Sequence, residues 1–146
     1  MGNFPGRNEL IIHFAHSAYQ FSNRLSARDT GINAFQSWTP EDTAKRIGEG
    51  HVLVVTGFWD NGFIAKGKNL HFIQACGAGY NQFDLDALIT KGLRFANASG
   101  VNVNAVSDHA MALILSLTRK IHLARDNQRA KHWRGMIADI AQRAAQ

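Results

Sequence analysis

The sequence predicts an α/β protein with a doubly wound parallel sheet and a long C-terminal helix. Short apolar runs alternate with amphipathic segments through the first hundred residues, which is typical of βα units. A longer helical pattern follows them. The chain has 146 residues, of which 45% are hydrophobic and 18% charged. This length can bury one ordinary core but leaves little room for two complete domains. We therefore divide the chain into a sheet domain, residues 1–103, and a helical region, residues 104–146.

Four apolar runs are the expected strands. They span residues 10–14, 51–56, 70–75 and 93–97. The run HVLVVT over 51–56 is β-branched and uninterrupted, as expected for a strand that is covered on both faces. The resulting sheet should therefore be parallel, with helices on its two sides.

Three segments between the strands carry helix signals. Residues 18–27 follow the first strand and are the expected first helix. Thr39 is a favourable N-cap, Pro40 suits the first helical position, and two acids occupy the first turn, so a second helix begins there. A third helix is expected over 84–91, ended by Gly92.

The helical region begins at about Asn104 and is expected to continue to Ala124. Steps of three and four residues align one stripe, which consists of Ala105, His109, Ala112, Leu113, Ser116 and Leu117. Other apolar side chains, Met111, Ile114 and Leu115, lie on different faces. A helix that is apolar on several sides must be buried against more than its own sheet.

The charge of the chain raises nucleic acid as a partner. The formal net charge is +5, and the basic residues concentrate late in the sequence: Arg119, Lys120, Arg125, Arg129, Lys131, Arg134 and Arg143. Aromatic residues are sparse in that region and no nucleic-acid-binding motif is present. A basic helix is also typical of a surface that an acidic partner would normally cover, seen without that partner. We therefore expect no nucleic-acid partner.

The cysteine count and the length of the apolar runs indicate the cellular compartment in which the protein is expected. Cys76 is the only cysteine, so no internal disulfide can form, and no Cys/His spacing typical of a structural zinc site occurs. No metal site is expected. The longest apolar segment, Ala110 to Leu117, is too short to span a bilayer. A soluble, cytoplasmic protein with no membrane partner is the expectation.

The segment from Phe72 to Asp84, FIQACGAGYNQFD, contains the clearest candidate site. It begins like a dinucleotide-binding loop, but Gln82 stands where G-x-G-x-x-G requires its third glycine. The next strand ends at Asn97 without an acid for a ribose. No cofactor-binding residue is therefore predicted here. Two glycines at the carboxyl end of a strand still allow backbone N–H groups to face a small anion. The alternative is a tight turn that holds no ligand.

From about His51 to Gly135 the chain resembles the NAD-dependent D-isomer-specific 2-hydroxyacid dehydrogenases. The resemblance rests on the glycine turn followed by Asp84, on the strand over 93–97, and on the helix opening Ala105-Val106-Ser107-Asp108-His109-Ala110. The family usually has Ala-Glu-His where this chain has Ser-Asp-His, which still leaves an acid in the first turn. The first fifty residues match weakly.

The resemblance implies a flavodoxin-like substrate-binding (catalytic) domain over 1–103 and an interdomain or dimerisation helix region over 104–146. It also implies that the backbone N–H groups of Ala78 and Gly79 bind the substrate carboxylate. Asn102 matches the asparagine that formate dehydrogenases use to bind substrate, although an asparagine in a turn also bonds its own backbone. The substrate is then a small 2-hydroxy or 2-oxo acid.

The resemblance also implies functional parts that this chain lacks. In the family, NAD or NADP binds a G-x-G-x-x-G loop downstream of this segment, and an Arg, a Glu and a His further on perform the chemistry. The sequence given ends at Gln146. We expect no catalytic residue within it, no tight cofactor binding, and no activity from the chain alone. His109 matches a structural histidine of the family, not its catalytic one. A homodimer through the helix from Asn104 to Ala124 is expected, and a stand-alone carboxylate-binding or dimerisation module remains the alternative.

Overall fold

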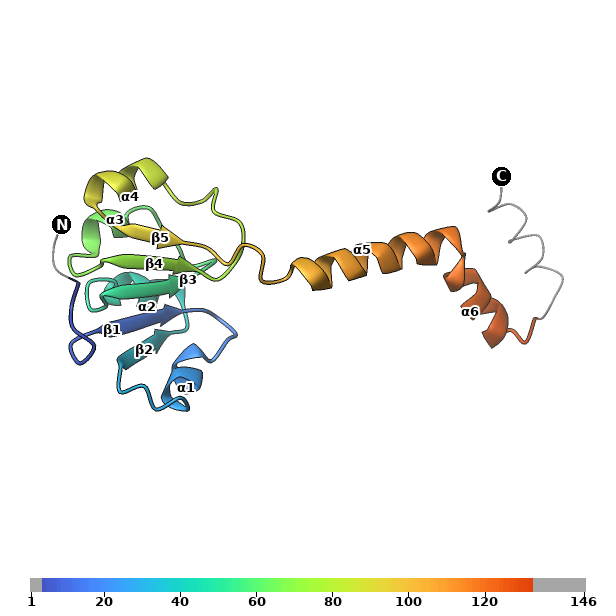
Figure 1. Ribbon diagram of the computed structural model, residues 1–146, viewed down its shortest axis with the longest axis horizontal. Helices are drawn as coiled ribbons and strands as arrows, with labels where there is room; N and C mark the ends of the chain where they lie inside the picture. Colours follow the sequence, from blue (N-terminus) through green and yellow to red (C-terminus); the bar gives the residue numbers. More distant parts are fainter. Residues whose placement is uncertain (1–3, 133–146) are drawn as a thin grey trace. The chain divides into compact units, whose positions relative to one another are not determined.

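The computed structural model describes residues 4–132, which divide into one compact unit up to Val101 and a second from Asn102 onward. The first unit contains a single sheet in which every strand pair is parallel (Figure 1). Its strands are β1 Ile11–Ala15, β2 Asn33–Ser37, β3 Val52–Val55, β4 Phe72–Ala75 and β5 Arg94–Ala96. Their order, β2-β1-β3-β4-β5, is the flavodoxin-like order. The predicted doubly wound parallel sheet is confirmed.

Short helices connect the strands. They are α1 Phe21–Ser26, α2 Pro40–Arg46, α3 Phe63–Lys66 and α4 Leu85–Lys91. Helices α1 and α2 contact β2, α4 contacts β5, and α3 contacts α4. The connections are therefore βα crossovers, as the alternating pattern predicts.

Local capping determines where two of these helices begin and end. The Thr39 side chain accepts from Asp42 N–H at 3.2 Å, and the Asp84 carboxylate accepts from Ala87 N–H at 3.0 Å. Gly92 ends α4 in the left-handed conformation, with φ of 72°, which glycine adopts without steric cost. The predicted starts and the predicted stop are confirmed.

The core lies between the sheet and its helices. Leu53, Val55 and Ile73 are fully buried on the two central strands, and Leu88 of α4 is 1% exposed. Residues on β3 and β4 alternate between buried and half-buried, so both faces of these strands are largely covered.

Two elements of the first unit were not predicted. Strand β2, with the sequence NAFQS, is polar and lies at the edge of the sheet, so it lacks the apolar run of a central strand. Helix α3 has four residues, too few for a helical period. The first helix also begins at Phe21, three residues later than the expected span of 18–27.

The second unit contains α5 Val103–Thr118 and α6 Ile121–Arg129. The prediction of one helix from Asn104 to Ala124 is wrong, because Lys120 takes a left-handed conformation with φ of 52°. The Thr118 hydroxyl donates to the Ile114 carbonyl at 2.9 Å, and Lys120 N–H donates back to the Leu117 carbonyl at 3.2 Å. These bonds close the helix as a glycine C-cap would.

Within residues 4–132, no helix is long and apolar enough to cross a membrane.

Candidate functional site

The glycine turn leaves the sheet at its carboxyl edge. Ala15, Val55 and Ala75 are in register at the ends of β1, β3 and β4. Cys76 extends β4 by one residue, since its N–H donates to the Val55 carbonyl at 3.0 Å. Gly77 and the rest of the turn follow directly. This is the edge at which open α/β sheets bind ligands.

The turn is fixed by its carbonyl groups. Ala98 N–H donates to the Gly77 carbonyl at 3.0 Å, and the Asn97 carboxamide donates to the Ala78 carbonyl at 2.7 Å. These bonds tie the turn to the end of β5. Asn97 was predicted only as a strand end without an acid, whereas in the structure its carboxamide positions the turn.

The N–H groups of Ala78 and Gly79 are available. Neither donates a hydrogen bond to any residue of the described range 4–132. Both residues are exposed. A Cβ atom built on Gly79 would meet nothing within 4 Å, and its φ is not in the left-handed region. The backbone of the turn does not require glycine there, so the absent side chain leaves open space beside two N–H groups.

Asn61 supports the far end of the same loop. Its carboxamide oxygen accepts from Asp84 N–H at 3.0 Å and from the Trp59 indole at 2.8 Å, while its nitrogen donates to the Gln82 carbonyl at 3.2 Å. Sequence reasoning missed this residue. In a sequence, a lone asparagine between two strands predicts only a turn. The three partners of Asn61 are brought together by the fold, so the sequence did not reveal them.

The turn does not fit a dinucleotide. Gln82 stands at the third fingerprint position, and the Asp84 carboxylate caps the start of α4. That negative charge lies where a pyrophosphate would approach the helix N-terminus. Strand β5 is followed by Asn97 and not by an acid. The turn therefore suits a small anion held by backbone N–H groups better than it suits a cofactor.

Asn102, the third predicted substrate residue, is the first residue of the second unit. Its carbonyl accepts from Val106 N–H at 2.9 Å, and its side chain makes no cap hydrogen bond to α5. The structure describes the two units separately, so the approach of Asn102 to the glycine turn stays a prediction.

Two other residues weighed in the sequence have ordinary surroundings. Cys76 is half-buried, and burial raises the pKa of its thiol, with the nearby Thr56 hydroxyl acting in the opposite direction. A raised pKa keeps the thiol protonated and unreactive. His109 is exposed on α5. Among residues 4–132, no three His, Cys, Asp or Glu side chains gather as a metal site would require.

Comparison with known proteins identifies relatives. The sequence model of the family "D-isomer specific 2-hydroxyacid dehydrogenase, catalytic domain" matches residues 14–145. Glyoxylate/hydroxypyruvate reductase B of Yersinia pestis is 28% identical over 113 residues, which is 74% of this chain and 34% of that protein. The chain thus spans about a third of the length of the curated relatives that it matches.

Solved structures share the fold. A 2-hydroxyacid dehydrogenase from Ketogulonicigenium vulgare Y25 superposes with a TM-score of 0.67 at 20% identity, over 86% of this chain and 41% of that one. An acyclic imino acid reductase in complex with NADPH and D-Arg superposes with a TM-score of 0.69 at 18% identity, over 88% and 44%. At these identities the structural likeness supports the fold alone.

Proposed function

The chain belongs to the D-isomer specific 2-hydroxyacid dehydrogenase family, and from this premise we propose that it is the substrate-binding part of an oxidoreductase. The whole enzyme would interconvert a D-2-hydroxy acid and a 2-oxo acid. NAD or NADP would supply or accept the hydride in that reaction. The glycine turn does not fit a dinucleotide, so we assign the cofactor and the reacting side chains to parts outside residues 4–132, and this chain alone would be inactive.

One observation carries the proposal. Ala78 and Gly79 present two N–H groups without partners among the described residues, beside open space at the carboxyl edge of the sheet. A carboxylate that accepts both bonds gains charge-assisted hydrogen bonds. The carbonyls of the same turn are held by Asn97 and Ala98, so the donors are oriented before the anion arrives. This arrangement would fix the acid end of a 2-oxo acid and leave its C2 carbon exposed.

We further propose the roles of the two regions. Residues 1–103 would form the substrate-binding domain and residues 104–146 the interdomain and dimerisation region. Large apolar side chains on α5 are exposed, among them Met111 at 53%, Ile114 at 52% and Leu115 at 50%. An exposed apolar surface of this kind favours association. A two-fold homodimer through α5 would cover it. We also propose Asn102 as a substrate-binding residue. The cytoplasm remains the proposed location.

The substrate assignment is tested by amide chemical shifts. Oxalate or glyoxylate added to the ¹⁵N-labelled chain should shift the Ala78 and Gly79 signals in a saturable way. Gly79→Val should abolish these shifts, because the new side chain occupies the open space without a clash that would unfold the loop. Gly6→Val is the matched control, since its Cβ makes only an ordinary contact, 3.9 Å from Glu9, before β1. Shifts that persist in Gly79→Val would remove the assignment.

A further inference from the structure

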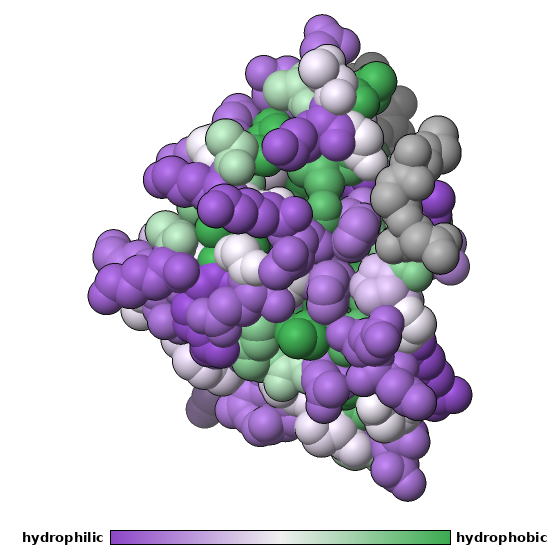
Figure 2. All heavy atoms as spheres, turned by 90° about the vertical axis from the view of Figure 1, so that its left-hand side faces the viewer, coloured by the Kyte–Doolittle hydropathy of each residue, from purple (hydrophilic) through white to green (hydrophobic). Residues whose placement is uncertain are grey.

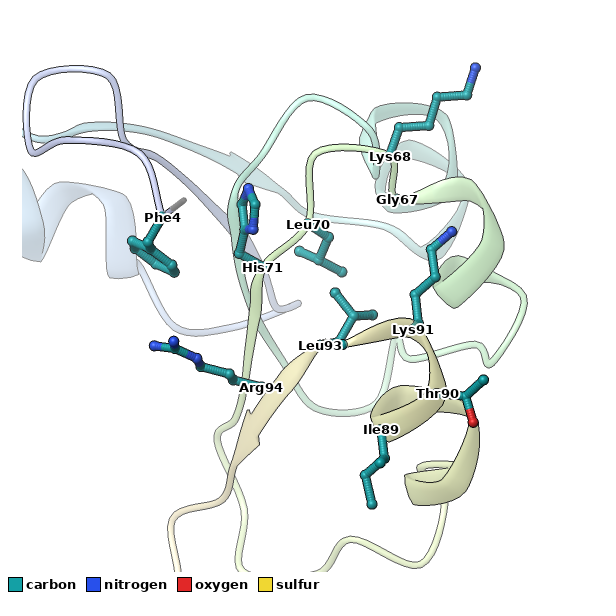
Figure 3. Close-up of a pocket in the computed structure, with 11 residues that line it drawn as sticks. Phe4, Gly67, Lys68, Leu70, His71, Ile89, Thr90, Lys91, Leu93 and Arg94 are labelled. Atoms are coloured by element: carbon teal, nitrogen blue, oxygen red, sulfur yellow. The ribbon is translucent and has the colours of Figure 1, made fainter. Parts of the chain in front are cut away.

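A cavity of about 670 Å³ opens at the opposite, amino edge of the sheet (Figure 3). Its walls come from the loop before β4, the last turn of α4 and the start of β5. Figure 2 faces this edge and shows small apolar areas enclosed by hydrophilic side chains. The volume lies within the range of about 300–1,000 Å³ that is usual for small-molecule sites. The glycine turn, at the carboxyl edge, contributes nothing to it.

The cavity combines an apolar floor with cationic walls. Leu70 and Leu93 are 5% and 8% exposed and lie at its centre (Figure 3). Lys68 and Lys91 lie on one side of the two leucines, and Arg94 with the imidazole of His71 lies on the other. Among the described residues, no acid lines the cavity.

These cations have no partner within the part of the chain that the structure describes. Among residues 4–132, the only ion pair within 4.0 Å joins Arg46 to Glu49, and neither residue lines the cavity. The side chains of Lys68, Lys91 and Arg94 also donate no hydrogen bond to the described residues. One lysine near a helix C-terminus is common, because it complements the helix dipole. Three exposed cations around one hollow, without an acid among the described lining residues, instead produce a positive potential that attracts anions.

The backbone around the cavity is fixed. Gly67 N–H donates to the Phe63 carbonyl at 2.8 Å. A Cβ at Gly67 would meet that oxygen at 3.0 Å, a tight contact that glycine avoids. Arg94 N–H donates to the His71 carbonyl at 3.1 Å and joins the two strand starts. A preformed wall spares a ligand the entropy of ordering it.

We propose that this cavity binds a small organic phosphate monoester. A phosphate monoester carries about −1.5 to −2 charges and three acceptor oxygens, which suits several ammonium and guanidinium donors better than a single carboxylate does. Its apolar part would lie against the exposed side chains of Phe4 and Ile89, which line the same cavity beside Leu70 and Leu93. The site is separate from the carboxylate turn, so the two ligands can be bound together.

Phenyl phosphate is the test ligand, followed by ¹H–¹⁵N shifts of the amides of residues 67–71 and 89–94. It should bind about tenfold more tightly than inorganic phosphate, because half of a phenyl ring would leave water. Lys68→Gln combined with Lys91→Gln should weaken phenyl phosphate by about tenfold or more. The charge-matched control, Arg28→Gln with Lys45→Gln, removes two exposed cations outside the cavity and should leave the affinity unchanged.

Three results would overturn the proposal. They are an absence of saturable shifts at these amides, an equal loss of affinity in the control double variant, and binding of benzoate as tight as that of phenyl phosphate. The amides of Ala78 and Gly79 should stay unshifted with phenyl phosphate, and Gly79→Val should not alter its affinity. These readouts distinguish a failure of this site from a failure of the carboxylate turn.

Discussion

His13 makes the stability of the sheet unit depend on pH. Its side chain is 1% exposed in the middle of β1, and its pKa is lowered from an ordinary value of 6.5 to about 4, chiefly by burial. The Arg46 guanidinium is the second contribution to this lowered pKa, while Asp42 and Glu49 act in the opposite direction. Nε2 lies 2.9 Å from the Ser37 hydroxyl, and the buried Nδ1 has no partner among the described residues. Protonation would place an N–H on both ring nitrogens, and the one on the buried Nδ1 would have no acceptor among the described residues.

The size of the effect follows from the two pKa values. Above pH 6.5 the imidazole is neutral in both the folded and the unfolded chain, and it contributes nothing to the pH dependence. Between pH 6.5 and 4 the unfolded chain binds a proton that the folded chain does not, so stability falls as the pH falls. The loss should reach about 2 kcal/mol at pH 5 and about 3 kcal/mol at pH 4.

Urea unfolding at pH 7.5 and at pH 5, followed by tryptophan fluorescence, measures this loss. His13→Gln keeps a polar group for the Ser37 hydroxyl but does not titrate, so most of the difference between the two pH values should disappear. His109→Gln, an exposed histidine, should keep it. A wild-type free energy of unfolding that is equal at pH 7.5 and pH 5, or an undiminished loss in His13→Gln, would refute the reasoning.

Two further predictions concern partners. Titration calorimetry with NADH should show no tight binding to this chain. Gln82 breaks the glycine fingerprint, and Asp84 places a negative charge at the start of α4. A micromolar affinity for NADH would contradict this prediction. The protein should be a dimer, so light scattering should give about twice the monomer mass of 16.1 kDa. Leu115→Lys should shift the protein toward monomer, because burying an unpaired ammonium in the interface costs several kcal/mol. Asn104→Lys, at the exposed start of the same helix, is the control, and a monodisperse wild-type monomer with its helices intact would disprove the dimer.

The candidate site was predictable in part. The open space beside the N–H groups of Ala78 and Gly79 follows from two glycines after a strand, a local feature that is visible in sequence. Asn61 and Asn97 were not predictable as its supports, because their partners lie up to 23 residues away in the chain. The cationic cavity was equally hidden, since Lys68 and Arg94 come from segments that only the sheet brings together.

Sequence alone determined the elements whose signals are local. The apolar runs of β1, β3 and β4, the cap at Thr39, the helix over 84–91 and the stop at Gly92 depend on neighbours within a few residues, and all of them form as expected. Tertiary structure decided the rest. The polar strand β2 is held by its pairing with β1, and His13 owes its lowered pKa first to burial in the folded sheet unit and then to the Arg46 guanidinium of α2. Backbone pairing and desolvation are non-local interactions, so a one-dimensional pattern does not encode them directly.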